Sequence, residues 1–191
     1  MQLEQVYELN LPSFSEIIRK DFTGFRSVSE NYDYLAGKNL NSIIKPEWLN
    51  FHGFKWNSFR YFKKNAIAGS IHTDLDSEED YYAKKCIWGI NWIFNGSGTI
   101  DFWHFKNVNC TGNTLGPANS PKIFNVPKFI ATTKPDFSYS TFKDKVYLIN
   151  ASLPHKAIGD TNRCAFSLRT DILSTDWETI VYKFKEYIIY Q

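Results

Sequence analysis

Two of the four histidines in the chain belong to a pattern that could bind a metal ion. His72 lies two residues before Asp74, giving His72-Thr73-Asp74, and His155 follows later in the chain. In a β-strand residues i and i+2 lie on the same face, so the side chains of His72 and Asp74 could reach one ion. Imidazole and carboxylate ligands together suit a borderline divalent ion such as Fe(II). The pattern predicts a metal site made of His72, Asp74 and His155.

Taken alone, the His-x-Asp pair is a weak signal, because the same sequence can occur where the histidine only caps a turn. The segment after it strengthens the prediction. His155 follows Pro154 at the start of a strand-like segment, and the next such segment carries Arg163 and Arg169. Two histidines and one carboxylate leave half of an octahedron open, as a metal that binds a cosubstrate and dioxygen requires. The planar donors of an arginine would clamp the far carboxylate of a dicarboxylic acid.

A predicted helix at each end of the chain flanks the segments that must position these residues. Ser13 and Glu16 form a capping-box pattern before an apolar stripe. Thr175 and Glu178 repeat the pattern before residues 177–188, whose apolar side chains recur at helical spacing.

Between these helices the sequence predicts strands. Aromatic residues make up 17% of the chain, which favours strands packed face to face. The turn Asn95-Gly96-Ser97-Gly98 predicts a hairpin, and a Lys-Lys-Asn turn separates the first two strands. The predicted strands are residues 54–62, 66–73, 86–94, 99–105, 145–150 and 163–172. Many short strands joined by turns indicate a mainly β sandwich or barrel.

One segment is predicted to lack regular structure. Residues 107–121 are rich in Gly, Asn and Pro, and they are expected to form a long loop that is either a lid over the site or disordered. At 191 residues the chain fits a single domain, 1–191, with its core at about 54–172.

The segments around the candidate ligands resemble the 2-oxoglutarate- and Fe(II)-dependent dioxygenase superfamily. The likeness is carried by His72-Thr73-Asp74, by the segment WGINWIFNGSG and by the segment NASLPHKAIGDTNRCAFSLR. It covers roughly residues 54 to 172. Within the superfamily the chain looks most similar to small hydroxylases near the prolyl- and aspartyl-hydroxylase branches, including virus-encoded ones.

The resemblance implies a double-stranded β-helix, a cupin-like jelly roll with flanking helices, and a hydroxylase activity. Fe(II) and O2 would be required, with ascorbate as a stimulant. 2-Oxoglutarate would be the cosubstrate, converted to succinate and CO2 as the substrate is hydroxylated. Arg163 would pair with the 5-carboxylate of 2-oxoglutarate. Arg169 either reaches the cosubstrate, holds an acidic substrate group or is a surface residue. Asn91 either donates to a cosubstrate carboxylate or bonds the sheet edge.

The composition narrows the class of partner. The net charge is +2 and no long basic block occurs, so the electrostatic footprint of a nucleic-acid-binding protein is missing. The start of the chain has no secretion-signal pattern, and the apolar runs are too short to span a bilayer. Three cysteines without CxxC spacing indicate reduced thiols. We expect a cytoplasmic enzyme that acts on a small molecule or a peptide, without nucleic acid or membrane.

Two other functions could use the same residues. A non-dioxygenase cupin-like barrel could hold zinc or manganese in another enzyme or in a sensor. A viral structural jelly-roll module would carry the triad by coincidence. The arginine that follows His155 favours the dioxygenase, because neither alternative needs a clamp for a cosubstrate.

Overall fold

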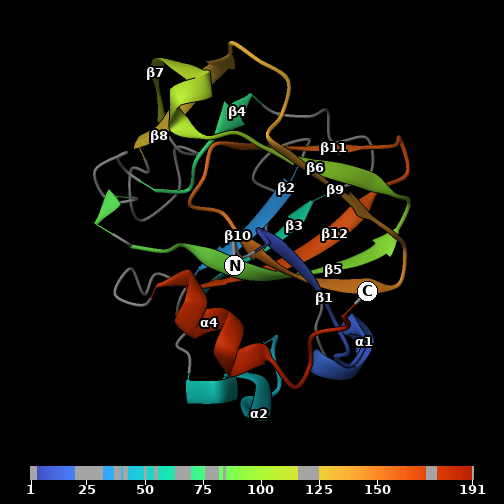
Figure 1. The fold of residues 1–191 in the computed structure, drawn as a ribbon. Coiled ribbons are helices and arrows are strands. Elements are labelled where there is room, and N and C mark those ends of the chain that lie inside the picture. The colour runs from blue at the N-terminus through green and yellow to red at the C-terminus, as the bar shows by residue number, and fades with distance from the viewer. Residues whose placement is uncertain are drawn as a thin grey trace.

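The computed structural model describes the chain in several stretches. They are residues 4–19, 32–36, 40, 43–49, 51–53, 56–62, 70–75, 82–83, 85–115, 125–170 and 176–190. Within these stretches the protein is mainly β, with two six-stranded antiparallel sheets and a few short helices (Figure 1). The mainly β class is the one that the sequence predicts.

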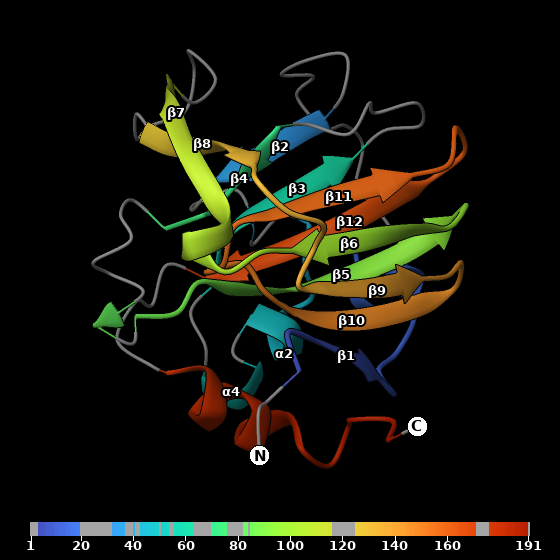
Figure 2. The ribbon, with the colours of Figure 1, turned by 45° about the horizontal axis from the view of Figure 1, so that its top comes forward.

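Each sheet takes strands from distant parts of the chain. The order in the first sheet is β1 (Val6–Leu9), β10 (Lys145–Asn150), β5 (Trp88–Asn95), β12 (Cys164–Thr170), β3 (Trp56–Phe62) and β2 (Tyr32–Ala36). The order in the second sheet is β7 (Val108–Leu115), β8 (Asn125–Ala131), β4 (Ile71–His72), β11 (His155–Gly159), β6 (Gly98–Phe102) and β9 (Phe137–Thr141). Figure 2 shows β7, β8 and β4 at one end of the second sheet, and β11 follows β4 in the strand order.

Successive strands from β3 to β6 alternate between the two sheets, as do those from β9 to β12. The predicted hairpin at residues 95–98 is therefore wrong, because its turn joins β5 and β6 of different sheets. Gly96 has a φ of +67°, and the Asp160 carboxylate accepts hydrogen bonds from the backbone and hydroxyl of Ser97. These bonds tie the turn to the connection between β11 and β12. Turn residues predict a chain reversal, but the pairing partners depend on the whole sheet.

The predicted loop at 107–121 is wrong for most of its length. Val108–Leu115 form β7, which pairs with β8 in the second sheet through a β-bulge between Cys110 and Gly112. β7 is polar, so its sequence did not indicate a strand. It forms one because β8 supplies its backbone hydrogen-bond partners. Residues 116–121 and the turn at 63–65 lie outside the described residues.

The described helices are short and lie outside the sheets. They are α1 (Phe14–Ile17), α2 (Pro46–Leu49), α4 (Trp177–Phe184) and two 3-10 turns, η2 (Phe51–Gly53) and η3 (Phe105–Asn107). The Ser13 backbone and hydroxyl donate to Glu16, as the capping-box pattern predicts. The cap of α4 differs from the prediction, because Asp176 accepts from the Thr179 backbone. None of the described helices is long and apolar enough to cross a membrane.

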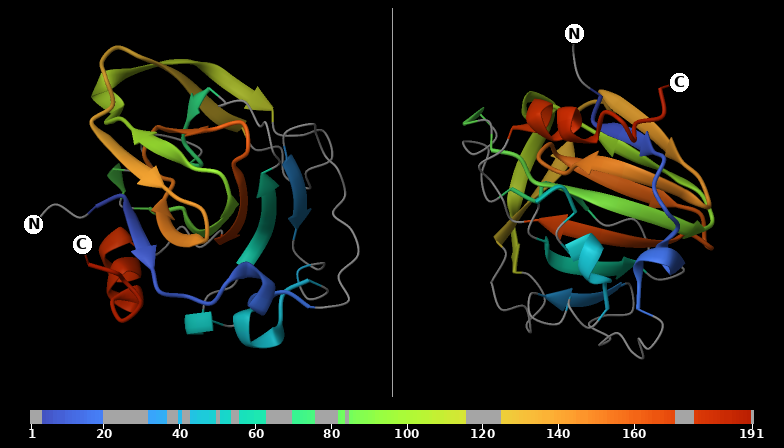
Figure 3. Two further views of the ribbon diagram at one scale, coloured as in Figure 1. Left: turned by 90° about the vertical axis from the view of Figure 1, so that its right-hand side faces the viewer. Right: turned by 90° about the horizontal axis from the view of Figure 1, so that it is seen from below.

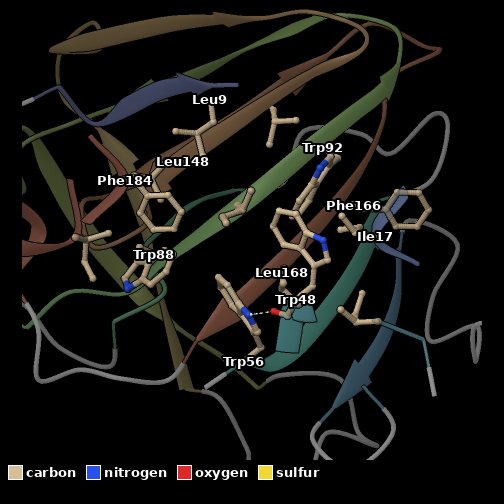
Figure 4. Packing of buried hydrophobic residues seen from close by; sticks show 14 of the residues in the cluster. Leu9, Ile17, Trp48, Trp56, Trp88, Trp92, Leu148, Phe166, Leu168 and Phe184 are labelled. Atoms are coloured by element: carbon tan, nitrogen blue, oxygen red, sulfur yellow. Dashed lines mark hydrogen bonds between the residues drawn. The ribbon is translucent and has the colours of Figure 1, made fainter. Parts of the chain in front are cut away.

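Two apolar clusters fix how the sheets and helices pack. One lies between the sheets and includes Ile93, Phe102 and Ala165. The other covers the outer face of the first sheet, where the helices lie (Figure 3). Figure 4 shows its tryptophans, among them Trp56, whose indole donates to the Trp48 carbonyl at 2.8 Å. Full burial of each large apolar side chain stabilises the fold by about 1.5–3 kcal/mol. The inner faces of the two sheets are thereby held toward each other.

Candidate metal centre

The two histidines of the predicted triad face each other across neighbouring strands. His72 ends β4, His155 begins β11, and the two are direct register partners with ring centroids 4.6 Å apart. Each Nδ1 lies 2.9 Å from a backbone carbonyl two residues earlier, at Ser70 and Leu153. Carbonyl oxygens only accept, so each Nδ1 must donate, and in the neutral ring the lone pair is then on Nε2. Such bonds orient imidazoles that ligate metals.

Asp74 lies close to the two histidines, but it is part of a bend and not of the strand β4. β4 ends at His72, so the alternation argument that placed Asp74 on its face does not apply. The bend is attached to the segment that precedes β11. The Asp74 backbone N–H donates to the Ala151 carbonyl at 3.0 Å, and the Thr73 hydroxyl donates to the Ser152 carbonyl at 3.1 Å. These bonds join the two halves of the triad, which are distant in the sequence.

The three side chains come together as a group that could hold a metal ion. One ligand atom from each of His72, Asp74 and His155 lies within 4.8 Å of the other two. Asp74 Oδ1 is 3.9 Å from His72 Nε2, whereas Asp74 Oδ2 faces the Arg169 guanidinium at 3.5 Å. The arginine therefore engages one carboxylate oxygen and leaves the other directed at the histidines. The role of the three residues as metal ligands stays a prediction.

Burial keeps one of these histidines neutral. The His155 side chain is enclosed, and desolvation, together with the proximity of His72, lowers its pKa to about 3. Asp74 acts in the opposite direction, but burial outweighs it. His155 is therefore neutral at physiological pH, as an imidazole must be to donate a lone pair to a metal.

Arg169 is buried and belongs to the site. Its side chain lies over Gly89, its register partner on β5. A Cβ atom at Gly89 would approach Arg169 Cδ to 2.5 Å, so only glycine leaves room for the arginine. Of the three alternatives for Arg169, the surface residue is wrong. The ion pair with Asp74 is a contact that the sequence did not indicate.

Arg163 lies at the far end of β11 from His155. Its stem crosses the paired glycines Gly98 and Gly159, and a Cβ atom at Gly159 would meet Arg163 Cδ at 2.6 Å. Desolvation lowers the pKa of Arg163, although Asp160 partly opposes this, and an arginine remains charged. Arg163 Nε is buried without a hydrogen-bond partner among the described residues. The structure thus places a cation between the β5–β6 turn and the β11–β12 connection, with its Nε donor buried.

Asn91 lies between the two arginines on the inner face of the first sheet. Its neighbours Ile90 and Trp92 point into the outer cluster and Ile93 into the inner one, which places Asn91 inside. Its register partner on β12 is Ser167. Asn91 Oδ1 and Ser167 Oγ are both buried without a hydrogen-bond partner in the described part of the chain. Such a group costs about 1–3 kcal/mol, so these atoms indicate a place for a polar ligand.

Ser167 was missed by sequence reasoning. The signal was available, because Ser167 lies two residues before Arg169 and shares its face in an alternating strand. The remaining histidines lie elsewhere, as expected. His52 contacts the ring of Phe51 edge-on in η2, and the backbone of His104 donates to Asp136 at 2.8 Å.

Comparisons with known proteins add little to this geometry. No family model matches the sequence, and no curated protein matches it. Seventeen chains of solved structures match. One of them is the X-ray structure of E. coli ycfD, with a TM-score of 0.33 and 10% sequence identity. The alignment covers 70% of this chain and 29% of that one, so the chain spans less than a third of the length of ycfD.

Proposed function

We propose that this protein is an Fe(II)- and 2-oxoglutarate-dependent dioxygenase that hydroxylates a small molecule or a peptide. The observation that carries the proposal is the joint placement of two features at opposite ends of one strand, β11. One is the group of two histidines and one aspartate, and the other is Arg163, a half-buried arginine whose Nε is enclosed. The group would supply the ligands of a metal ion, and the arginine would supply N–H donors to a carboxylate of a dicarboxylic acid. A zinc or manganese barrel without a cosubstrate would use only the first of these.

The strand order supports a double-stranded β-helix. Strands β3, β12, β5 and β10 are neighbours in one sheet, and β4, β11, β6 and β9 are neighbours in the other. Eight strands that alternate between two facing antiparallel sheets make a jelly roll. In this arrangement β4 and β11 lie side by side, which is how the two histidines meet.

The donor set fits Fe(II). Two neutral imidazoles and one carboxylate oxygen would occupy one side of the ion and leave the other side for small oxygen ligands. The Nδ1–H bonds hold both rings with Nε2 toward the ion. Arg169 would keep Asp74 as a ligand through Oδ1 alone, because Oδ2 is engaged by the guanidinium. These contacts fix the ligands before any ion binds.

The polar residues of the inner face fit 2-oxoglutarate. β11 is five residues long, so its two ends are roughly 13 Å apart. A five-carbon dicarboxylate and an extended arginine side chain can fill this span together. Arg163 would bind the 5-carboxylate through two parallel N–H donors, and Asn91 and Ser167 would contact the middle of the cosubstrate. The buried Arg163 Nε–H and the Ser167 hydroxyl would then each have an acceptor, and Asn91 would donate through its amide nitrogen.

When bound, Fe(II), 2-oxoglutarate and O2 supply the oxidising chemistry, in which one oxygen atom enters succinate, with loss of CO2, and the other enters a substrate C–H bond. The residues of the chain bind and orient these groups and exclude water. Phe102, the register partner of His155, is fully buried with its ring centroid 5.7 Å from that of His155. It would keep water away from the buried side of the site.

A succinate-release assay tests the proposal. Purified protein with Fe(II), 2-oxoglutarate and ascorbate is screened against peptides, amino acids and nucleosides. We expect succinate only when metal, cosubstrate and oxygen are all present, with stimulation by one class of substrate. The matched control is His104→Ala, which alters a histidine outside the site, beside His155→Ala, which removes a ligand. Zinc or manganese bound tightly without any affinity for 2-oxoglutarate would instead favour the non-dioxygenase barrel.

A further inference from the structure

A row of side chains on the second sheet continues beyond the two histidines to a lysine. Direct partners in antiparallel strands carry their side chains on the same face, with Cβ atoms about 5 Å apart. The row, from one edge of the sheet to the other, is Gly112, Lys128, His72, His155, Phe102 and Phe137. Lys128 is therefore the neighbour of His72 on the side away from His155.

Within the described part of the chain, no carboxylate opposes the charge of Lys128. It is the one charged residue in β7 and β8, and it is half-buried. Among the described residues no carboxylate lies within 4.0 Å of its ammonium. The nearby Asp74 faces Arg169. A partly desolvated ammonium without a counter-charge attracts an anion.

No described residue covers one side of the face around Lys128. Gly112, its partner on β7, has no side chain, and a Cβ atom there would meet no atom within 4 Å. Ile130 lies two residues after Lys128 on the same face, and its exposed fraction is 63%. A ligand can therefore approach the ammonium from this side and lie next to His72.

We infer that Lys128 binds an anionic group of the substrate, a carboxylate or a phosphate, and so selects the substrate. The inference rests on the proposed function, in which Arg163 and the metal oppose the carboxylates of 2-oxoglutarate and Arg169 opposes Asp74. Among the described side chains next to the three candidate ligands, Lys128 is then the cation that is left for the substrate. A charge-assisted hydrogen bond of this kind strengthens binding by about ten- to a hundredfold. A neutral substrate would gain nothing from Lys128, and a cationic one would be repelled.

The anion site is tested first without metal. The full chain is labelled with 13C at the lysine ε-carbons, and the Lys128 signal is assigned by its loss in Lys128→Arg. Inorganic phosphate and acetate are then titrated separately. We expect the Lys128 signal to shift along a saturating curve, with the exposed Lys134 binding at least about tenfold more weakly. The probe that binds more tightly distinguishes a phosphate group from a carboxylate. A Lys128 signal that moves no more than that of Lys134 overturns the inference.

Variants and a paramagnetic ion complete the test. Phosphate binding, read from 31P line widths, is expected to persist in Lys128→Arg and Lys134→Gln and to be lost in Lys128→Gln. Mn(II) should broaden the Lys128 signal far more than the Lys134 signal, and His155→Ala should remove this effect. Bound Mn(II) that leaves Lys128 sharp overturns the inference. If no metal binds, the proposed function fails, while the phosphate titration still decides whether Lys128 forms an anion site.

Discussion

His72 and His155 are direct partners in the antiparallel pair of β4 and β11, and their ring centroids lie 4.6 Å apart. Because of this relationship, the geometry of the candidate metal centre depends on strand pairing as well as on the three side chains. The pairing fixes the distance between the rings, and each Nδ1–H bond fixes the ring rotation. Asp74 lies in a bend, and a backbone hydrogen bond joins this bend to the segment before β11.

Removal of a ligand should abolish metal binding without unfolding the protein. His72→Ala is the suitable change, because this side chain is one-third exposed and its loss leaves little buried space. We expect the affinity for Fe(II) or Co(II) to fall by more than about a hundredfold, since even the contacts that orient a ligand are worth 10–100-fold. The measurement is metal content after equilibrium dialysis, with His104→Ala as the control. Equal metal content in the two variants would remove His72 from the site.

The two arginines should have different effects. Arg163→Ala is expected to weaken 2-oxoglutarate binding by roughly 10–100-fold while metal affinity stays near that of the wild type, because a charge-assisted bond is lost. Arg169→Ala should weaken metal binding as well, because Asp74 loses the ion pair that directs its oxygen. Calorimetric titration of metal and then of 2-oxoglutarate separates the two effects. If Arg169→Ala impairs 2-oxoglutarate alone and Arg163→Ala does not, the clamp is Arg169.

Replacement of Gly89 by alanine, the residue with the smallest side chain, should destabilise the protein. In Gly89→Ala the new Cβ would lie 2.5 Å from Arg169 Cδ and 2.8 Å from the Leu168 carbonyl. We expect a loss of about 1–3 kcal/mol in the free energy of unfolding, as for other overpacked sites, together with weaker metal binding as Arg169 moves. Urea denaturation and metal titration measure these two quantities. A variant as stable as the wild type, with unchanged metal affinity, would show that Arg169 does not need this space.

Cys86 should make the protein less stable at alkaline pH. Burial raises its pKa to about 12, well above the value near 8.5 of an unfolded thiol. The unfolded chain therefore loses this proton first, so stability falls as pH rises from about 8.5 toward 12. At pH 10 the loss is on the order of 2 kcal/mol relative to pH 7. The free energy of unfolding at the two pH values, in wild type and Cys86→Ala, measures it. An identical pH dependence in both proteins would contradict the assignment.

The sequence predicted which residues come together better than the reasons for their geometry. The grouping of His72, Asp74 and His155 and the strand-rich fold could be read from the residues. The argument that Asp74 shares a strand face with His72 was wrong, because β4 ends at His72. The bonds that hold Asp74 come from residues 151 and 152, and no local pattern shows such a contact. The pairing of Lys128 with His72 likewise depends on which strands become neighbours. Local periodicity does not determine that choice.

The most direct measurement is an anaerobic titration of the protein with Fe(II) and then with 2-oxoglutarate. The account predicts one Fe(II) per chain, followed by one 2-oxoglutarate that binds only after the metal and gives a visible absorption band from chelation of the ion. His155→Ala should bind neither, and Arg163→Ala should bind Fe(II) but require far more 2-oxoglutarate. An absence of Fe(II) binding, or 2-oxoglutarate binding that is equally tight without metal, would contradict the account.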